Sequence, residues 1–200
     1  MGGGSTDEII MTSTSNPELM AICYAQGWAS HSDYMTKREA EAVTSFGNVF
    51  KSFVGESLME LRYFTSVTLV GTSSFTNCSN LKYVWFSVSS VNGYNGAANT
   101  CIYTGCSSLI AARYDNLTRI GATTYNSPIK YAVVTSESVP VANSRFYESK
   151  FYVLDELVDL YKAAEYWKNK TILSIHQLPT DYPDCPWLDD LREKGLISTT

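Results

Sequence analysis

Two histidines and five cysteines are the side chains in this 200-residue chain best suited to metal binding or nucleophilic chemistry. His31 and His176 lie far apart in the sequence, and no C-x-x-C pair occurs, so the paired spacing typical of zinc ligands is absent. An enzyme needs a nucleophile beside a base, a metal, or separated carboxylates in a pocket. Neither histidine falls in such a motif. We therefore predict that the chain is not an enzyme and has no cofactor or metal.

Carboxylates gather at two places, where acid catalysis might otherwise be considered. Asp155, Glu156 and Asp159 open one predicted helix, and the pair at 189–190 begins another with a basic last turn. Acidic side chains stabilise the positive N-terminal end of a helix. Both groups are therefore interpreted as helix-terminus features rather than catalytic pairs.

Calcium binding is a third chemistry to consider, in the loop at 27–35 between two predicted helices. If Glu39 is the twelfth position of an EF-hand loop, Trp28, Ser30 and Ser32 take the first, third and fifth. Calcium loops use mainly carboxylates at these early positions. Two hydroxyls and one Glu carry too little charge to replace the hydration shell of the ion. We predict an EF-hand-shaped segment without metal.

Cys78 and Cys106 occupy equivalent places in a segment that is written twice. Residues 75–86 read FTNCSNLKYVWF, residues 103–114 read YTGCSSLIAARY, and a weaker third copy, SPIKYAVV, covers residues 127–134. Repetition at about twenty to thirty residues is typical of solenoids, in which each unit buries its apolar edge against its neighbours. We predict that both thiols are buried in the solenoid interior and are not joined by a disulfide.

The repeats also predict which strand residues face outward. Successive side chains of a strand point to opposite faces. Val84 and Phe86 align with Ala112 and Tyr114 of the second copy and are placed inward. Tyr83 and Trp85 are then expected to face outward.

The predicted binding surface combines this outward face with an irregular excursion at 91–100, VNGYNGAANT, whose Asn-Gly pairs indicate turns. The candidate binding residues are Tyr83, Trp85, Tyr94, Asn95 and Tyr103, with Tyr114 as a further aromatic. A row of exposed aromatic side chains suits a glycan or a protein partner.

The elements that hold these residues form an α/β chain, which we divide into five parts. Residues 1–15 are a flexible leader, and residues 16–62 are a helical N-terminal cap that contains the EF-hand-like loop. A solenoid of about three to four irregular coils covers 63–154. Residues 155–179 form a C-terminal helical cap, and residues 180–200 form a tail with a short helix.

Local signals support the expected helices. Asn16 and Pro17 are typical of a helix start. Residues 36–39, TKRE, form a capping box, in which Thr and Glu each satisfy a free backbone N–H. Residues 156–167 keep the i, i+3, i+4 apolar pattern of a helix, with Leu160 on its buried side.

Composition limits the possible partners. The net charge is −5, only 18% of residues are charged, and the fifteen basic residues are scattered, so we expect no nucleic-acid partner. No stretch is long and apolar enough to span a membrane. The N-terminus lacks the basic and apolar regions of a signal peptide.

The repeated pattern resembles a known family. Residues 75–84, F-x-N-C-S-x-L-K-x-V, and their copy at 103–112 resemble BspA-like leucine-rich repeats. Residues 151–169 resemble the segment that caps such arrays, with Leu154 where the family usually has Pro. Residues 21–52 resemble the EF-hand-like helical piece that precedes these repeats in proteins of gut anaerobes, without its Asp ligands.

This resemblance covers about residues 17–175 and implies a recognition or adhesion module. Such a module binds a protein or glycan ligand through the solenoid surface, outside the cell or on its surface as a mature fragment. The missing export signal leaves an alternative open, a structural virion or assembly subunit such as a phage head or tail decoration. That subunit would bind copies of itself or neighbouring coat proteins, with residues 180–200 as its interaction arm.

Overall fold

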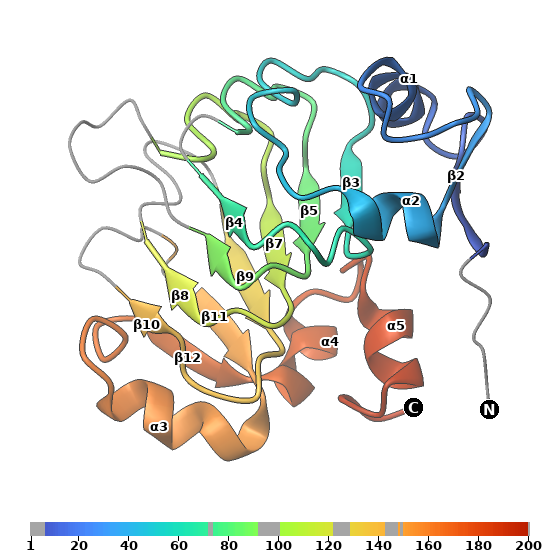
Figure 1. Ribbon diagram of the computed structural model, residues 1–200. Helices are drawn as coiled ribbons and strands as arrows, with labels where there is room; N and C mark the ends of the chain where they lie inside the picture. The colour runs from blue at the N-terminus through green and yellow to red at the C-terminus, as the bar shows by residue number, and fades with distance from the viewer. Residues whose placement is uncertain are drawn as a thin grey trace.

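The computed structural model of the protein has an α/β fold built around a β-solenoid of about four turns, with few helices (Figure 1). It describes residues 7–71, 74–91, 101–121, 129–142, 148 and 150–199. The chain winds repeatedly between a six-stranded and a four-stranded parallel sheet. The main hydrophobic core fills the space that the coils enclose.

The six-stranded sheet is built from successive strands of the chain, in the order β12-β11-β9-β7-β5-β3. Its strands are β3 (Leu58–Leu61), β5 (Tyr83–Phe86), β7 (Ala111–Tyr114), β9 (Tyr131–Val134), β11 (Lys150–Val153) and β12 (Thr171–Ser174). The first four of them along the chain, β3, β5, β7 and β9, are each followed by a strand of the four-stranded sheet and so belong to the solenoid turns. The sequence copies are in register, because Tyr83 pairs with Ala111 and Ala111 pairs with Tyr131. The repeat unit seen in the sequence is therefore one coil of the solenoid.

The four-stranded sheet is built from short strands in the order β10-β8-β6-β4. These are β4 (Leu69–Val70), β6 (Ser90–Val91), β8 (Arg119–Ile120) and β10 (Val141–Ala142). Val70, Val91 and Ile120 are fully buried against the main core, whereas Leu69 and Val141 at the two edges are exposed. Inward and outward positions alternate as they do in any strand.

The two repeated cysteines join successive coils. The Cys78 thiol donates a hydrogen bond to the carbonyl oxygen of Phe50 at 3.0 Å, and the Cys106 thiol donates to that of Phe75 at 2.7 Å. Both side chains are fully buried, and neither forms a disulfide. The prediction of buried thiols without a disulfide is confirmed.

A residue with left-handed backbone conformation recurs in the turn of each of three coils. The φ angles are +62° at Ser52, +61° at Asn77 and +78° at Gly105. The amide of Ser52 donates to the carbonyl oxygen of Thr76, and that of Asn77 donates to the carbonyl oxygen of Thr104, both at 2.8 Å. A Cβ on residue 105 would lie 2.2 Å from the Asn77 Oδ1 atom, so glycine is required there. The first coil therefore includes Ser52 and β3, ahead of the expected solenoid start at residue 63.

The N-terminal part packs against this first coil. It contains β1 (Ile9–Thr12), α1 (Pro17–Ala25), β2 (Tyr34–Thr36) and α2 (Lys37–Ala42), with β1 and β2 antiparallel. Leu19, Met20 and Cys23 of α1 are buried in the main core. The capping box is confirmed, since Thr36 accepts from the amide of Glu39 and the Glu39 carboxylate accepts from the amide of Thr36.

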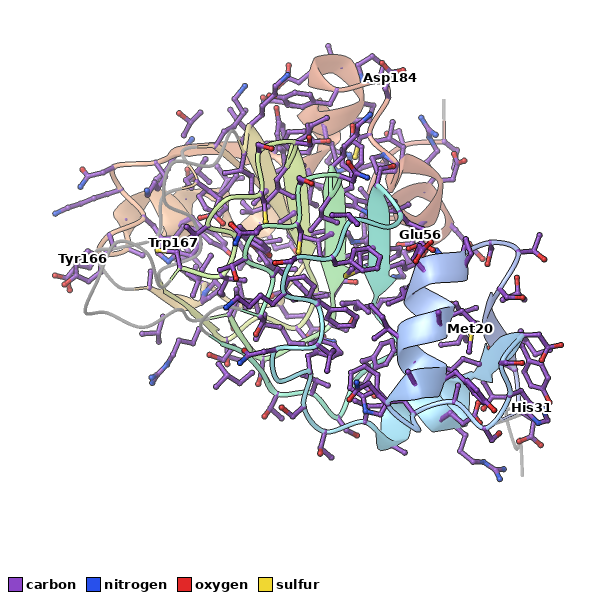
Figure 2. The ribbon with its side chains drawn as sticks, turned by 90° about the horizontal axis from the view of Figure 1, so that it is seen from above. Met20, His31, Glu56, Tyr166, Trp167 and Asp184 are labelled. Carbon is purple, nitrogen blue, oxygen red and sulfur yellow. The ribbon has the colours of Figure 1, made fainter. Side chains whose placement is uncertain are left out.

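The C-terminal part contains several short helices. They are η2 (Asp155–Leu157), α3 (Val158–Ala163), η3 (Ile175–Gln177), α4 (Leu178–Asp181) and α5 (Leu188–Glu193). Trp167, just after α3, lies at the opposite end of the molecule from Met20 of α1 (Figure 2). No helix within the described ranges is long and apolar enough to cross a membrane.

The single helix expected over residues 156–167 is wrong in length, and the inward placement of Leu160 is wrong, although Leu157, Tyr161 and Trp167 are buried as expected. The α-helix ends at Ala163, and Leu160 is 59% exposed instead of buried. The chain turns at Tyr166, whose φ is +66°. This turn carries Trp167 into the core, where its indole N–H donates to the carbonyl oxygen of Pro140 at 2.9 Å. Burial of the indole ends the helix, and the chain then returns to the sheet as β12.

Candidate functional site

The outer face of the six-stranded sheet, turned away from the solenoid interior, is covered by residues 175–199 of the same chain, which we call the C-terminal segment (Figure 1). The strands contribute Trp85, Ala111, Tyr131, Val133 and Tyr152 to this second core. The C-terminal segment contributes Ile175, Leu178, Cys185, Trp187, Leu188, Leu191 and Ile197. Residues 180–199 therefore complete the fold of their own chain.

The expectation that Trp85 is exposed is wrong, although its facing is correct. Val84 and Phe86 point inward and are fully buried, so Trp85 lies on the outer face. Its side chain is nevertheless only 3% exposed, because the C-terminal segment lies over it. Strand alternation predicts the face of a residue but cannot predict what covers that face.

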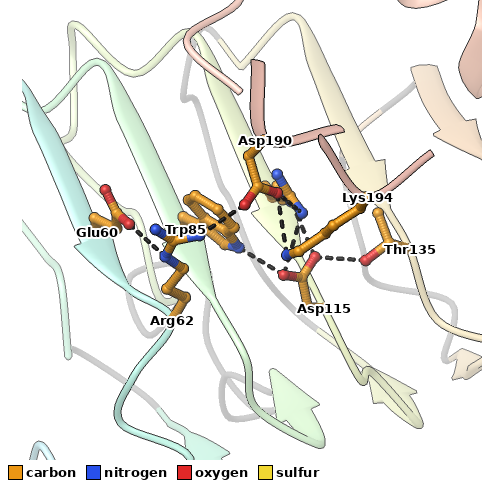
Figure 3. A network of polar contacts seen from close by, with 8 residues as sticks. Glu60, Arg62, Trp85, Asp115, Thr135, Asp190 and Lys194 are labelled. Atoms are coloured by element: carbon orange, nitrogen blue, oxygen red, sulfur yellow. Dashed lines mark hydrogen bonds and ion pairs between the residues drawn. The ribbon is translucent and has the colours of Figure 1, made fainter. Parts of the chain in front are cut away.

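Trp85 lies at the centre of a polar network on this outer face (Figure 3). Its indole N–H donates to Asp115 Oδ2 at 2.7 Å. The guanidinium carbons of Arg62 and Arg113 lie 4.3 Å and 3.9 Å from its ring centroid. Cations at such distances are attracted to the electron-rich face of an indole. These contacts fix the ring in place beneath the C-terminal segment.

Asp190 of α5 connects the C-terminal segment to this network. Its Oδ1 atom lies 2.7 Å from Nη1 of Arg62, and its Oδ2 atom lies 2.8 Å from Nη2 of Arg113 and 3.1 Å from Nζ of Lys194. Burial alone would raise the pKa of Asp190, but Arg113 and Lys194 hold it below its usual value. The ionised carboxylate therefore anchors α5 over Trp85.

Beside this anchored region lies an accessible cleft of about 230 Å³, which we call the Tyr83 cleft. It is lined by Tyr83, Ile110, Lys130, Tyr131, Asp181, Tyr182, Pro183, Asp184 and Cys185. Tyr131 and Cys185 are buried and form its floor, and Tyr83, Ile110 and Tyr182 are half-buried. The remaining residues are exposed, with Asp184 on the C-terminal segment (Figure 2).

The tyrosines of the cleft are held by their neighbours. The rings of Tyr131 and Tyr182 are stacked with centroids 3.9 Å apart, and the Tyr83 ring meets Trp187 edge-on at 5.9 Å. Burial raises the pKa of Tyr83, and the nearby Cys185 and Asp184 add to this effect. The Tyr83 hydroxyl therefore stays protonated at neutral pH and can donate a hydrogen bond.

The charged groups of the cleft are available to a ligand. Lys130 and Asp184 are exposed, and within the described residues neither side chain has a hydrogen-bond or ion-pair partner. Asp181 already accepts a hydrogen bond from the Tyr152 hydroxyl. The cleft thus offers an exposed ammonium donor and an exposed carboxylate acceptor.

Of the predicted binding residues that the structure describes, Tyr83 lines the cleft, whereas Trp85 and Tyr103 do not. Tyr103 is fully buried, so the expectation that it is exposed is wrong. Its ring packs 6.4 Å from Phe75 in the solenoid interior, and its hydroxyl lies 3.1 Å from that of Tyr114, which is also buried. Tyr94 and Asn95 lie outside the described residues.

Sequence reasoning missed the residues that the C-terminal segment brings to the cleft, namely Asp181, Tyr182 and Asp184. The available signal was the mixture of acids, aromatics and prolines in DYPDCPW, at residues 181–187. Nothing in a single sequence places that segment beside Tyr83, because the contact is long-range.

The EF-hand-like loop uses Glu39 as a hydrogen-bond acceptor. The carboxylate accepts from the amide and hydroxyl of Ser30 at 2.8 Å and 2.5 Å, and from those of Thr36 at 2.8 Å and 3.0 Å. Burial alone would raise the pKa of Glu39, but these hydrogen bonds lower it to about 2. In the described ranges, no group of three His, Cys, Asp or Glu side chains could hold a metal ion.

The two histidines lie at the surface, each beside one neighbouring side chain. The His31 ring stacks on Tyr34 with centroids 4.3 Å apart. His176 Nε2 lies 3.8 Å from Asp155 Oδ2, with both side chains about half exposed. Both are surface contacts.

Comparison with known protein families, curated proteins and solved structures finds no significant match to this chain.

Proposed function

We propose that this protein is a non-enzymatic recognition or adhesion module that binds a protein or glycan ligand in the Tyr83 cleft. One observation carries the proposal. On a face otherwise covered by the C-terminal segment, the cleft joins half-buried tyrosines to the exposed charges of Lys130 and Asp184, which have no ion-pair partner among the described residues. Apolar walls with a few polar groups are typical of binding sites.

We further propose that the solenoid is of the BspA-like leucine-rich-repeat type, with helical caps at both ends. The buried leucines Leu81 and Leu109 and the thiol hydrogen bonds between coils support this assignment. The N-terminal cap is supported by the burial of Leu19 and Met20 in the main core. The C-terminal cap is supported by the burial of Tyr161 of α3. A protein of this type would act at a cell surface.

The test compares the wild-type protein with Tyr83→Ala on a glycan array and on an array of extracellular proteins. Tyr24→Ala is the matched control, because Tyr24 is 51% exposed on α1, outside the cleft lining. We expect signals from the wild-type protein and the control that Tyr83→Ala has lost. Signals that all three proteins share would exclude the cleft as the binding site.

Assembly into a virion or other structure is a second candidate function, supported by one apolar surface. Val141 and Tyr166 are 66% and 38% exposed and line a cleft of about 310 Å³ near the end of the solenoid. Such a surface suits contact with another subunit. Light scattering would give an oligomer for the wild-type protein and a smaller species for Val141→Asp. A monomeric wild-type protein would argue against self-assembly.

A further inference from the structure

We propose that the Tyr83 cleft binds one neutral pyranose residue of a glycan. This inference rests on the proposed recognition function and names the ligand class of the same site. Three properties of the cleft support it: its size, its tyrosine walls and the balance of charges around it.

The size of the cleft favours a single ring. Its volume of about 230 Å³ lies below the roughly 300–1,000 Å³ of cavities that enclose drug-sized ligands. A helix or a long peptide segment would not enter it, whereas a six-membered sugar ring would. The exposed positions of Lys130, Asp181 and Asp184 leave room for the rest of a glycan chain to continue into solvent.

The walls of the cleft suit the C–H groups of a sugar. Tyr83 and Tyr182 are half-buried and held by Trp187 and Tyr131 respectively. Tyrosine offers a rigid apolar ring with a polar tip, at a small cost in conformational entropy. The apolar side of a pyranose can pack on such rings, while its hydroxyls reach the polar groups.

The polar groups of the cleft supply both kinds of hydrogen bond. Lys130 and the protonated Tyr83 hydroxyl donate, and the Asp184 carboxylate accepts. A sugar hydroxyl both donates and accepts, so it can satisfy all of these groups. Charged donors and acceptors also form stronger hydrogen bonds than neutral ones.

The charges around the cleft are balanced, which favours a neutral ligand. Asp181 and Asp184 are opposed by Lys130 and by Lys150, whose ammonium lies 5.4 Å from the Tyr182 ring centroid. A cationic ligand would be attracted by the two carboxylates and repelled by the two lysines. An anionic ligand would be attracted by the lysines and repelled by the carboxylates. The cleft therefore favours neither a cationic nor an anionic ligand.

The experiment titrates the folded full-length protein with methyl glycosides of glucose, galactose, mannose and N-acetylglucosamine, followed by NMR chemical-shift changes. N-acetyl-lysine methylamide serves as a cationic probe. We expect saturable binding of at least one sugar, weakened about tenfold or more in Tyr83→Ala and in Asp184→Asn. Tyr24→Ala should bind the sugar as the wild-type protein does. Near-native spectra of each variant exclude unfolding as the cause.

The outcomes separate this inference from the proposed function. If no sugar binds, or if Tyr83→Ala binds as tightly as the wild-type protein, the sugar inference is wrong. If the cationic probe or an arrayed protein then binds in a Tyr83-dependent way, the recognition function stands with another ligand class. If no ligand depends on Tyr83, both proposals fail.

Discussion

The Asp190 carboxylate lies 2.8 Å from the guanidinium of Arg113, an arginine whose side chain is fully buried. This contact joins the last helix of the chain to the middle strands of the solenoid sheet, beside Trp85 (Figure 3). A buried charge that loses its partner is strongly destabilising. Arg113 also pairs with Asp115 at 3.0 Å, so the Asp190 ion pair adds to the apolar packing that holds the C-terminal segment on the sheet.

We predict that Asp190→Asn lowers the free energy of unfolding by about 3 kcal/mol, because Arg113 remains buried with one carboxylate fewer. Asp189→Asn is the control, since the side chain of Asp189 is 99% exposed, and its effect should stay within about 0.5 kcal/mol. Urea unfolding of both variants gives the comparison. Equal stabilities of the two variants would show that the ion pair does not hold the segment.

Trp85→Ala should also destabilise the protein, by about 3–5 kcal/mol, because it removes a buried indole and its hydrogen bond to Asp115. Leu160→Ala, at a position 59% exposed, should change stability little. Thermal unfolding measures both effects. A stable Trp85→Ala that had lost ligand binding would instead support an exposed, ligand-contacting Trp85.

The repeat in the sequence was sufficient to predict the coils that carry its copies and the facing of their strands. Tyr83, Ala111 and Tyr131 are in register, and Val84 and Phe86 face the core. These features depend on strand alternation and on the spacing of the copies, which are local properties. The sequence pattern does not reveal the first coil, because Phe53 occupies the position that Cys78 has in the next coil.

The covering of the outer face could not be predicted in the same way. Trp85 and Asp190 are far apart in the chain, and their proximity depends on how the C-terminal segment packs as a whole. The predicted exposure of Tyr103 is wrong for a different reason. It aligns with Phe75 in the turn of the preceding coil, and that position is in the core.

Calcium should not raise the melting temperature. A ligand that binds only the folded state stabilises it, but both Glu39 oxygens already accept hydrogen bonds from Ser30 and Thr36. Differential scanning fluorimetry with and without millimolar calcium tests this. An increase that Glu39→Gln abolishes would establish a calcium site.

Glu39 should also contribute to the pH dependence of stability. Its pKa is lowered to about 2 in the folded protein, compared with about 4.3 in an unfolded chain. The stability that the ionised Glu39 carboxylate contributes is therefore fully present above about pH 4.3 and is lost as the pH falls toward 2. The stability difference between the wild-type protein and Glu39→Gln should shrink over this range. A difference that stayed constant would mean that the hydrogen bonds do not favour the ionised form.

Thiol labelling of the native protein should be slow at Cys78 and Cys106, because both side chains are fully buried. Interaction with the Cys78 thiol, together with burial, raises the pKa of Cys106 and disfavours its reactive thiolate. Burial also raises the pKa of Cys23 to about 12. Mass spectrometry after iodoacetamide treatment should find these positions unmodified until denaturant is added. Rapid native labelling would contradict the interior placement.

The central claim is that recognition takes place in the cleft beside Tyr83. The most direct test is the dissociation constant of the strongest array ligand, measured by isothermal titration calorimetry for the wild-type protein, Tyr83→Ala and Tyr24→Ala. The account predicts that Tyr83→Ala raises this constant about tenfold or more, equivalent to about 1.4 kcal/mol, while Tyr24→Ala leaves it within about twofold. Equal dissociation constants for all three proteins would contradict it.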